Sequence, residues 1–511
     1  MIGEILRLSA ARFPDKTALI DGARRTTYAE LDARANRFAA ALAAHGIVKG
    51  ARIGVLAANC GDVATIFYGA ARAGVIMAPL STRTTAGDVA YMLNKIGAEA
   101  LFHSGDLGAI ASAARGAIAS LRHVVALDDR GEAGGGAFDA FLASGAAAPI
   151  PPPSPDDPLA ITFTGGTTGR PKAVVVTHRA RYATAVTGGV EFGLDERDVA
   201  LVATPLFHAA GLFVWFQTAV MLGLTCVILP RWDPSTAIAL IERHGCTATL
   251  LVPTQLGDLI ADPGFAPERL ASLRHMHYAG SPMALAVLDR AQALLPHVGF
   301  TENYGQSETG PMTVRRPFHP HDKRGSVGRP AHNVETRVLD TAGRECAVGV
   351  VGEIATRGPH VFSYYWDDPD ETRQSLRTGD GWLWTGDLGF RDADGFLHLV
   401  DRVKDMIVSG AENIYPAEVE NALYLHPAVG ECAVFGVPDD RWGEVPAAHV
   451  VLKPGANASE AELIAFVEGQ IARYKRPRFV RIVEVLPRTA VGKIQKSAIR
   501  EPYWAGRTRR I

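Results

Sequence analysis

Residues 161–176 read ITFTGGTTGRPKAVVV and form the most distinctive stretch of the chain. Its two ends, 161–164 and 173–176, are runs of β-branched and aromatic residues, which predicts a strand on each side of a loop. Glycines in the loop let successive backbone N–H groups point toward one place, and threonine hydroxyls and a lysine add donors. We therefore predict a phosphate site. Its candidate residues are Thr164, Gly165, Gly166, Thr167, Thr168, Gly169 and Lys172.

Two better-known phosphate loops do not match this segment. The G-x-x-x-x-G-K-[ST] spacing fails, and we expect a strand rather than a helix after the loop. The G-x-G-x-x-G pattern of dinucleotide-binding folds is absent from it as well. The composition alone is typical of a flexible surface loop, but the strand–loop–strand context and the terminal lysine favour a phosphate ligand.

On both sides of this loop, helical and strand patterns alternate. Apolar residues recur at helical spacing in 28–46, 63–74 and 284–297, and each helix is followed by a short buried strand pattern. Such alternation predicts an α/β fold with mostly parallel sheets. A Gly- and Pro-rich stretch at 131–158 is expected to be an extended linker.

After about residue 330 the pattern changes to β-hairpins, with turns at 341–343 and 394–395. The last hundred residues alternate short helices and strands in the manner of a small α+β domain. We therefore predict a large N-terminal domain over 1–401, made of two α/β lobes and a β-rich lobe. A small, mobile α+β domain is expected over 402–511.

Composition limits the partners and the compartment. The 511 residues carry 52 Lys and Arg against 54 Asp and Glu, a formal charge of −2, which argues against nucleic acid or an anionic membrane as partner. Five scattered cysteines without a C-x-x-C pair indicate neither disulfides nor a cysteine zinc site and suit a reducing compartment. The apolar stretch 211–230 is interrupted by Gln217 and Gly223, so we interpret it as a buried helix and strand. We expect a cytoplasmic protein without a membrane span or secretory leader.

The TGGTTGRPK loop resembles the signature loop of the adenylate-forming superfamily. That superfamily includes acyl-CoA synthetases, nonribosomal peptide adenylation domains and firefly-type luciferases. Further segments resemble its motifs, in order, over nearly the whole chain. They are PLFHAAG (205–211), YAGSP (278–282), NYGQSE (303–308), GEI (352–354), WTGD (384–387), DRVKDMI (401–407), ENIYPAEVE (412–420) and PRTAVGKI (487–494).

The resemblance implies a two-step reaction. A substrate carboxylate attacks the α-phosphate of ATP to give acyl-AMP and pyrophosphate, and coenzyme A then forms a thioester. Because the attack brings negative charges together, it needs fixed donors and a divalent cation. Glu308 resembles the family's Mg²⁺ ligand, which suits a hard cation that prefers oxygen. Lys493 resembles the lysine that bridges the carboxylate and the α-phosphate, and Thr164 and His208 complete the expected catalytic set.

The resemblance also assigns the nucleotide and acyl sites. Tyr304 would stack on adenine and Asn303 would bind its edge. Asp387 would accept hydrogen bonds from both ribose hydroxyls, and Arg402 would hold the ribose or the phosphate. The other side of the purine slot is expected to comprise Gly280, Ser281 and Pro282, with Gly305 beside Tyr304. The acyl-site residues are expected to be Phe207, His208, Phe213, Gly280, Gly305 and Met312. These residues indicate an apolar acid larger than acetate, such as an aryl, medium-chain or polycyclic acid.

Two positions depart from the family pattern. Gly165 stands where serine is common, which removes one hydroxyl from the loop. The segment Ser409-Gly410-Ala411-Glu412 would line the coenzyme A passage, where many relatives carry two glycines in place of Gly410-Ala411. Because a methyl group there can narrow the passage, one alternative is an enzyme with weak CoA transfer that hands the adenylate to a partner enzyme or carrier protein. Lys404 occupies the expected hinge.

Other functions were weighed against this one. An amino-acid adenylation domain is disfavoured because no Phe-Asp-x-Ser-type segment precedes Pro205. A non-catalytic nucleotide binder would not need Lys493, Glu308 and Asp387. An oxygenase of the luciferase type rests on fold analogy alone, and a homodimer is left open. The histidine pairs 275/277 and 319/321 have no third ligand at metal spacing and are given no role.

Overall fold

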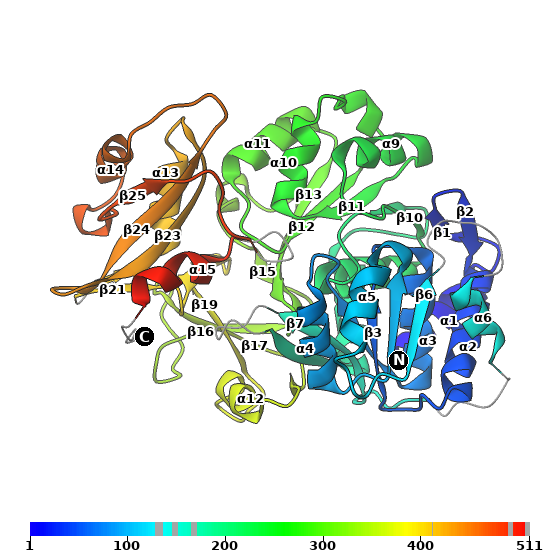
Figure 1. The fold of residues 1–511 in the computed structure, drawn as a ribbon. Helices are drawn as coiled ribbons and strands as arrows, with labels where there is room; N and C mark the ends of the chain where they lie inside the picture. The colour runs from blue at the N-terminus through cyan, green and yellow to red at the C-terminus, as the bar shows by residue number, and fades with distance from the viewer. Residues whose placement is uncertain (128–135, 146–151, 165–170, 411, 489–493, 506–511) are drawn as a thin grey trace. The chain divides into compact units, whose positions relative to one another are not determined.

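The computed structural model describes residues 1–127, 136–145, 152–164, 171–410, 412–488 and 494–505 (Figure 1). These residues form two compact units. The first takes the described residues up to 336 and returns for 356–383, and the second takes 337–355 and the described residues from 384 onward. The chain thus passes between the units near 336, 355 and 383. The domain boundary expected between 401 and 402 stays a prediction.

The first unit contains a seven-stranded sheet that carries the strands of the predicted phosphate loop. In order across the sheet the strands are β18 (Tyr364–Tyr365), β8 (Lys172–Thr177), β7 (Pro158–Thr164), β4 (Ile76–Leu80), β3 (Arg52–Leu56), β5 (Ala100–Ser104) and β6 (His123–Leu127). The strands from β7 to β6 run parallel, and β8 turns back antiparallel to β7. The strand–loop–strand prediction is therefore confirmed.

The first unit also contains a nine-stranded sheet. Its order is β15 (Arg329–Pro330), β14 (Gly310–Arg315), β13 (Gly299–Gln306), β12 (His275–Ala279), β11 (Ala248–Leu251), β9 (Val199–Val202), β10 (Thr225–Ile228), β1 (Thr17–Asp21) and β2 (Arg24–Thr27). The strands from β13 to β1 are parallel, so their carboxyl ends lie at one edge. That edge is where open α/β sheets usually bind ligands.

Helices cover these two sheets. They are α1 (Ile2–Arg12), α2 (Tyr28–Ala44), α3 (Gly61–Ala73), α4 (Ala86–Ile96), α5 (Gly108–Arg115), α6 (Ala137–Ala143), α7 (His178–Glu191), α8 (Gln217–Leu222), α9 (Pro234–His244), α10 (Pro253–Ala261), α11 (Leu285–Leu294) and α12 (Pro369–Ser375), with short helices η1 (Gly105–Leu107), η3 (Pro267–Leu270) and η4 (His321–Lys323). Helix α2 begins where sequence signals place it, at a capping box of Thr27 and Glu30. Figure 1 shows α9, α10 and α11 beside strands β11–β13.

The apolar stretch 211–230 folds as predicted into buried helix and strand. It comprises the π-helix η2 (Ala210–Phe216), all of whose residues are buried, followed by α8 and β10. Among the residues that the structure describes, no helix is both long and apolar enough to cross a membrane.

The linker expected over 131–158 was wrong for residues 137–143, which form α6. Phe138, Phe141 and Leu142 are buried there, and the Phe138 ring lies 5.8 Å from Phe38 and 6.2 Å from Phe102 between centroids. The Gly- and Ala-rich neighbours hid three apolar positions at helical spacing. Helix α6 is therefore part of the core and not a connector.

The second unit is built on two smaller sheets. One has the order β16 (Glu335–Leu339), β17 (Gly352–Arg357), β19 (Leu383–Arg391) and β20 (Leu397–Arg402). The other has the order β22 (Glu412–Ile414), β21 (Ile407–Ser409), β24 (Gly443–Leu452) and β23 (Val429–Asp439), with β25 (Val480–Ile482) paired to β24. Its helices are α13 (Pro416–Tyr424), α14 (Glu460–Glu468) and α15 (Lys496–Arg500), with η5 (Arg473–Lys475) and η6 (Glu501–Trp504).

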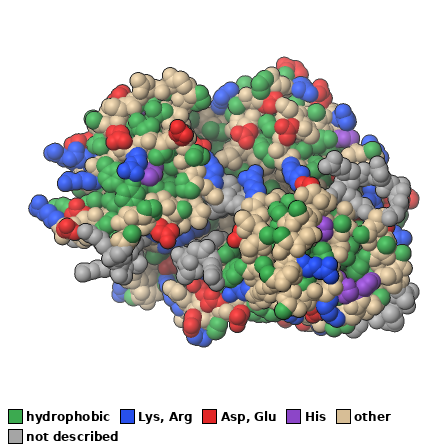
Figure 2. Space-filling view, viewed as in Figure 1, with side chains coloured by type: hydrophobic (Ala, Val, Ile, Leu, Met, Phe, Trp, Pro, Cys, Tyr) green, Lys and Arg blue, Asp and Glu red, His purple; other side chains and the backbone are tan. Residues whose placement is uncertain are grey.

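The predicted fold class, a mixed α/β chain with a large multi-sheet N-terminal part and a small C-terminal part, is confirmed. The turn predicted at 394–395 joins β19 to β20. On the face shown in Figure 2, basic and acidic side chains are interspersed, in keeping with a net charge of −2.

Candidate active site

The predicted phosphate loop is closed by Thr164 and Lys172. Thr164 ends β7, Lys172 begins β8, and the two residues are paired in the sheet register. The hairpin therefore holds both ends of the loop at one sheet edge. The other predicted loop residues, Gly165, Gly166, Thr167, Thr168 and Gly169, lie outside the described residues, so their roles stay predictions.

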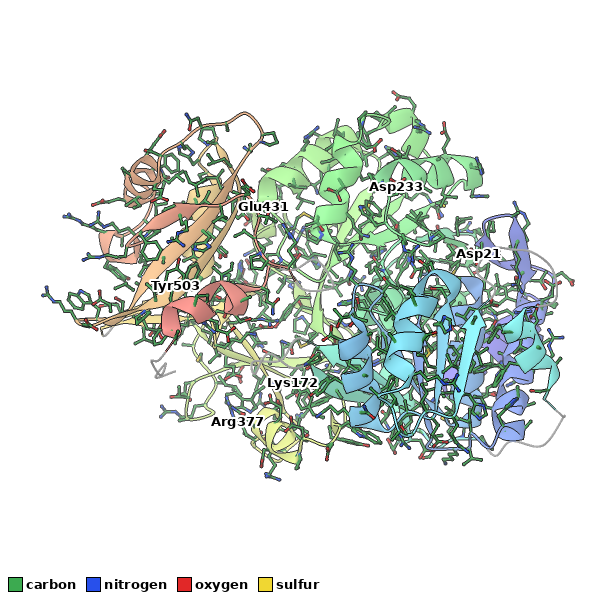
Figure 3. The ribbon with its side chains drawn as sticks, in the orientation of Figure 1. Asp21, Lys172, Asp233, Arg377, Glu431 and Tyr503 are labelled. Atoms are coloured by element: carbon green, nitrogen blue, oxygen red, sulfur yellow. The ribbon has the colours of Figure 1, made fainter. Side chains whose placement is uncertain are left out.

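Lys172, labelled in Figure 3, belongs to a polar cluster that extends to Glu308. Its ammonium forms an ion pair with Glu371 in α12 and lies 5.4 Å from the centroid of the Tyr365 ring. The Tyr365 hydroxyl donates a hydrogen bond of 2.8 Å to Glu308 Oε1. Burial and the Glu308 carboxylate raise the pKa of Tyr365, so its hydroxyl stays protonated and remains a donor. One aromatic side chain thus contacts both the predicted phosphate lysine and the predicted Mg²⁺ ligand.

Glu308 is suited to share a magnesium ion with a nucleotide. It is a buried carboxylate at the end of the NYGQSE segment, beside β14. Within the described part of the chain, no cluster of three or more His, Cys, Asp or Glu side chains could hold a metal by itself. Mg²⁺ commonly takes one or two carboxylates together with phosphate oxygens. Glu308 would therefore supply one ligand of an ion held mainly by ATP.

The two segments expected to enclose the purine are neighbours. Ala279, at the end of β12, is the register partner of Asn303 in β13, so Gly280 and Tyr304 follow on adjacent parallel strands. Gly280 has a φ of +94°, which glycine adopts readily and which turns the chain away from the sheet. Ser281 and Pro282 are exposed, and Tyr304 is half-buried. The structure therefore brings together the predicted walls of the slot at the carboxyl edge of the sheet.

Asn303 has unsatisfied hydrogen-bonding capacity. Its side chain is 4% exposed, and neither its amide nitrogen nor its amide oxygen has a hydrogen-bond partner in the described structure. A buried amide without partners is costly. The edge of adenine offers both a donor and an acceptor, so it would complement this amide.

A buried ion pair fixes the strands below the slot. Arg315 in β14 contacts Glu302 in β13 at 3.2 Å, and both bond to the Tyr278 hydroxyl in β12. Strands β12, β13 and β14 are thereby joined by side chains as well as by the backbone ladder, just below Gly280, which follows β12, and Asn303 and Gly305, which lie in β13.

His208 is positioned by a tight turn. Its N–H donates to Pro205 O at 3.0 Å, and its Nδ1 accepts from the Ala210 N–H at 3.2 Å. A neutral imidazole that accepts at Nδ1 carries its proton on Nε2. An added Cβ at Gly211 would lie 2.2 Å from Pro205 O, so only glycine lets η2 pack against this turn. Phe207 and His208 are both half-buried.

The remaining predicted acyl-site residues come from two elements. Phe213 in η2 and Met312 in β14 are both fully buried. Gly305 is exposed, and an added Cβ there would lie 1.8 Å from Gly310 O, which explains why glycine is needed where β13 and β14 shift register.

Within the second unit, Asp387 and Arg402 form a pair. They are register partners in the β19–β20 hairpin, and Arg402 Nε lies 3.0 Å from Asp387 Oδ1. The Gly386 N–H donates to Glu353 Oε1 at 3.0 Å, which fixes the turn of the WTGD segment. Two residues that the sequence assigned separately to the ribose are thus in direct contact.

The predicted hinge and coenzyme A residues follow shortly after. Lys404 lies between β20 and β21, and its carbonyl accepts from Arg500 Nη1 at 3.4 Å. Ser409 and Glu412 pair across the β21–β22 hairpin, and Gly410 has a φ of +66°. Ala411 and Lys493 lie outside the described residues.

Sequence reasoning missed Tyr365 and Glu371. Both lie far along the chain from Lys172, and only the pairing of β18 with β8 brings them to it. No spacing in the sequence signals a two-residue strand, so this part of the site needed the structure.

Comparison with known proteins identifies relatives that match the family expected from the sequence motifs. The family model of AMP-binding enzymes matches residues 6–366, and that of the AMP-binding enzyme C-terminal domain matches residues 418–493. The fatty acid–[acyl-carrier-protein] ligase ScoC of Streptomyces coeruleorubidus is 35% identical over 98% of this chain and 95% of its own. A feruloyl-CoA synthase of an Amycolatopsis species is 36% identical over 96% of both chains. The ATP-bound crystal structure of MatB from Rhodopseudomonas palustris has a TM-score of 0.90 and 30% identity, with 98% of this chain and 99% of that chain covered.

These matches extend along nearly the whole chain. The chain therefore belongs to the AMP-binding enzyme family, as an AMP-forming acid–thiol ligase.

Proposed function

We propose that this ligase activates a bulky apolar, aryl or medium-chain carboxylic acid as acyl-AMP and then forms its thioester with coenzyme A. The observation that carries the proposal is the cluster of Lys172, Tyr365 and Glu308. It places a cation and a carboxylate, joined by one phenol, beside the hairpin that closes the phosphate loop. This is the charge arrangement that ATP with Mg²⁺ requires.

The first step needs charge compensation more than covalent chemistry. Lys172 would exchange its Glu371 partner for ATP phosphates, and Asn303 would bind the adenine edge. Mg²⁺, when bound with ATP, reduces the negative charge of the phosphates. His208, whose Nε2 is the protonated nitrogen, would donate toward the reacting carboxylate and so orient it.

Residues of the second unit complete the proposed reaction. Asp387 would accept hydrogen bonds from the ribose hydroxyls, with Arg402 beside it, and Lys493 would stabilise the charge that builds up during attack. Because that charge peaks in the transition state, loss of Lys493 should lower kcat more than it weakens binding. Lys404 would be the hinge between the adenylating and thioester-forming arrangements.

A second candidate function differs only in the thiol that accepts the acyl group. A relative of 35% identity is named as a fatty acid–[acyl-carrier-protein] ligase, and Ala411 adds a methyl group to the predicted coenzyme A passage. Both observations favour transfer to a carrier protein as the alternative to transfer to coenzyme A.

One experiment tests the reaction and separates the acceptors. Pyrophosphate release is measured over a library of carboxylic acids, first with ATP and Mg²⁺ alone and then with coenzyme A or a carrier protein added. We expect release with at least one acid and faster turnover with coenzyme A. Release that only a carrier protein accelerates would favour the second acceptor. Release that persists in Lys493→Ala would remove that lysine from the mechanism.

A further inference from the structure

Arg181 is a buried cation that the proposed reaction leaves without a role. It lies in the first turn of α7, whose other buried residues are small except for His178. The whole residue is 0% exposed. Burial lowers the pKa of Arg181 to about 10, so the guanidinium is still charged at neutral pH. A buried charge is costly unless it is paired and fully hydrogen-bonded.

The guanidinium is incompletely satisfied. Nη2 donates to Ser307 O at 3.1 Å, and Nη1 is 3.5 Å from Thr184 Oγ1, which is a weak contact. Nε has no acceptor. Among the described residues, none of its hydrogen-bond partners is a carboxylate. Burial alone does not explain this, because Arg315 is also buried and is paired with Glu302.

Two ionisable groups, Glu308 and His360, interact electrostatically with Arg181, and neither is hydrogen-bonded to its guanidinium among the described residues. Glu308 interacts with it electrostatically, yet the carboxylate bonds to Tyr365 instead. His360, which faces it from the segment before β18, has a pKa lowered to about 3 by burial and by Arg181, so this imidazole is uncharged at neutral pH. The charge of Arg181 is therefore offset only through space, by the Glu308 carboxylate, and not by a hydrogen-bonded ion pair among the described residues.

Arg181 borders the predicted acyl site on two sides. Its guanidinium carbon lies 5.2 Å from the centroid of the Phe213 ring in η2. On the other side, an added Cβ at Gly310 would lie 3.3 Å from Arg181 Nη1, and Gly310 begins the strand that carries Met312. The same Cβ would lie 2.9 Å from Thr184 Oγ1, so glycine at 310 lets the start of β14 pack closely against Arg181 and its neighbour in α7.

We propose that Arg181 binds a second carboxylate of the acid substrate, at the end remote from the carboxylate that is activated. Nε and the remaining N–H of Nη2 lie on the same side of the guanidinium plane and form the fork that binds a carboxylate with two parallel hydrogen bonds. The substrate class is then a dicarboxylic acid with an apolar spacer, which fits walls made by Phe213 and Met312. This inference rests on the proposed function, because it names the substrate of the same site.

The test compares dicarboxylic acids with their monomethyl esters, which keep the length but lose the second charge. Pyrophosphate release is measured for both series with the wild-type protein, and we expect kcat/KM to be at least about 10-fold higher for the diacids. Arg181→Met should lower kcat/KM for the diacids by about 100-fold and leave the half-esters within about 3-fold. Equal kcat/KM for the two wild-type series would overturn the inference, and this comparison needs no variant.

Controls separate recognition from folding. Arg34→Met removes another largely buried arginine, which pairs with Asp62 and Asp139, and it should not change the ratio of diacid to half-ester. Arg181→Lys keeps the charge but not the fork and should recover part of the preference. A structural role alone would predict that Arg181→Met lowers both series and the melting temperature without changing their ratio, and that result would overturn the inference.

Direct binding distinguishes failure of this inference from failure of the proposed function. Calorimetry with a diacid or its half-ester, in the presence of a non-hydrolysable ATP analogue, measures recognition without turnover. If no acid releases pyrophosphate but the diacid binds about 10-fold more tightly than its half-ester, the proposed reaction fails and the Arg181 site stands. Equal dissociation constants would remove the Arg181 site even if acids are activated.

Discussion

Replacing Asn303 with leucine should change stability and ATP affinity in opposite directions. Asn303 lies in β13, and both polar atoms of its amide are buried without a hydrogen-bond partner among the described residues. Leucine has nearly the same size and a higher preference for strands than asparagine. The substitution therefore removes an unsatisfied amide without leaving a cavity.

The expected magnitudes follow from the two orphaned groups. An unpaired buried polar group costs about 1–3 kcal/mol, so removing the amide should stabilise the ligand-free protein by about 2 kcal/mol. For a unit of this size the melting temperature should rise by about 4 °C. Two hydrogen bonds to adenine at about 1 kcal/mol each are lost, which corresponds to about 30-fold weaker ATP binding.

The assay pairs thermal melting with ATP titration, and Asn59→Leu is the matched control. Asn59 is equally buried, but its amide donates to the Val202, Thr204 and Leu229 carbonyls and accepts from the Leu206 N–H at 2.7 Å. Asn59→Leu should therefore destabilise the protein by about 3 kcal/mol. If Asn303→Leu destabilises the protein to a similar degree, or leaves ATP affinity unchanged, the amide is not a nucleotide ligand and the reasoning fails.

The structure yields three further predictions. Burial lowers the pKa of His277 to about 3 from an ordinary 6.5, so the unfolded chain binds more protons below pH 6.5. Stability should therefore fall by about 2 kcal/mol between pH 7 and 5 from this residue alone, a loss that denaturant titrations of His277→Leu should no longer show. Gly305→Ala, whose methyl would lie 1.8 Å from a backbone carbonyl, should lower the unfolding free energy by about 3 kcal/mol, whereas Gly257→Ala in open space on α10 should be neutral or stabilising. Asp387→Asn weakens the contact with Arg402 without changing shape and should raise the KM for ATP by about 10-fold, and an unchanged KM would argue against ribose binding.

Periodicity and ordered motifs allowed most of the fold to be predicted. Helix α2, the β7–β8 hairpin and the β19–β20 turn follow from local signals of capping, alternation and turn residues. Helix α6 was missed because its three apolar residues are surrounded by Gly and Ala, where the composition resembles a linker. Local sequence patterns therefore predict an element when its own residues carry capping, alternation or turn signals. They miss an element, such as α6, that is recognisable only by its packing against the core.

The residues of the candidate site also fall into two groups, those that the sequence predicts and those that only the structure shows. Thr164 and Lys172 could be named because the residue types of their loop indicate a phosphate, whereas Asn303 and Glu308 were named through the resemblance of their segment to a family motif. Tyr365 contacts the site only through sheet pairing. The amide of Asn303 and the Nε of Arg181 lack hydrogen-bond partners among the described residues. A missing partner depends on the whole fold, so no local sequence pattern predicts it.

The π-helix η2 affects how the preference for an acid substrate could change during evolution. A π-turn holds one residue more than an α-turn, and here that turn carries Phe213. Loss of a single residue between Ala209 and Gln217 would restore α-helical spacing and rotate the preceding side chains by about 100° around the axis. Such a deletion would change which side chain faces the substrate while keeping the helix itself. In this segment a change in length, and not only in residue type, offers a short evolutionary route to a different acid.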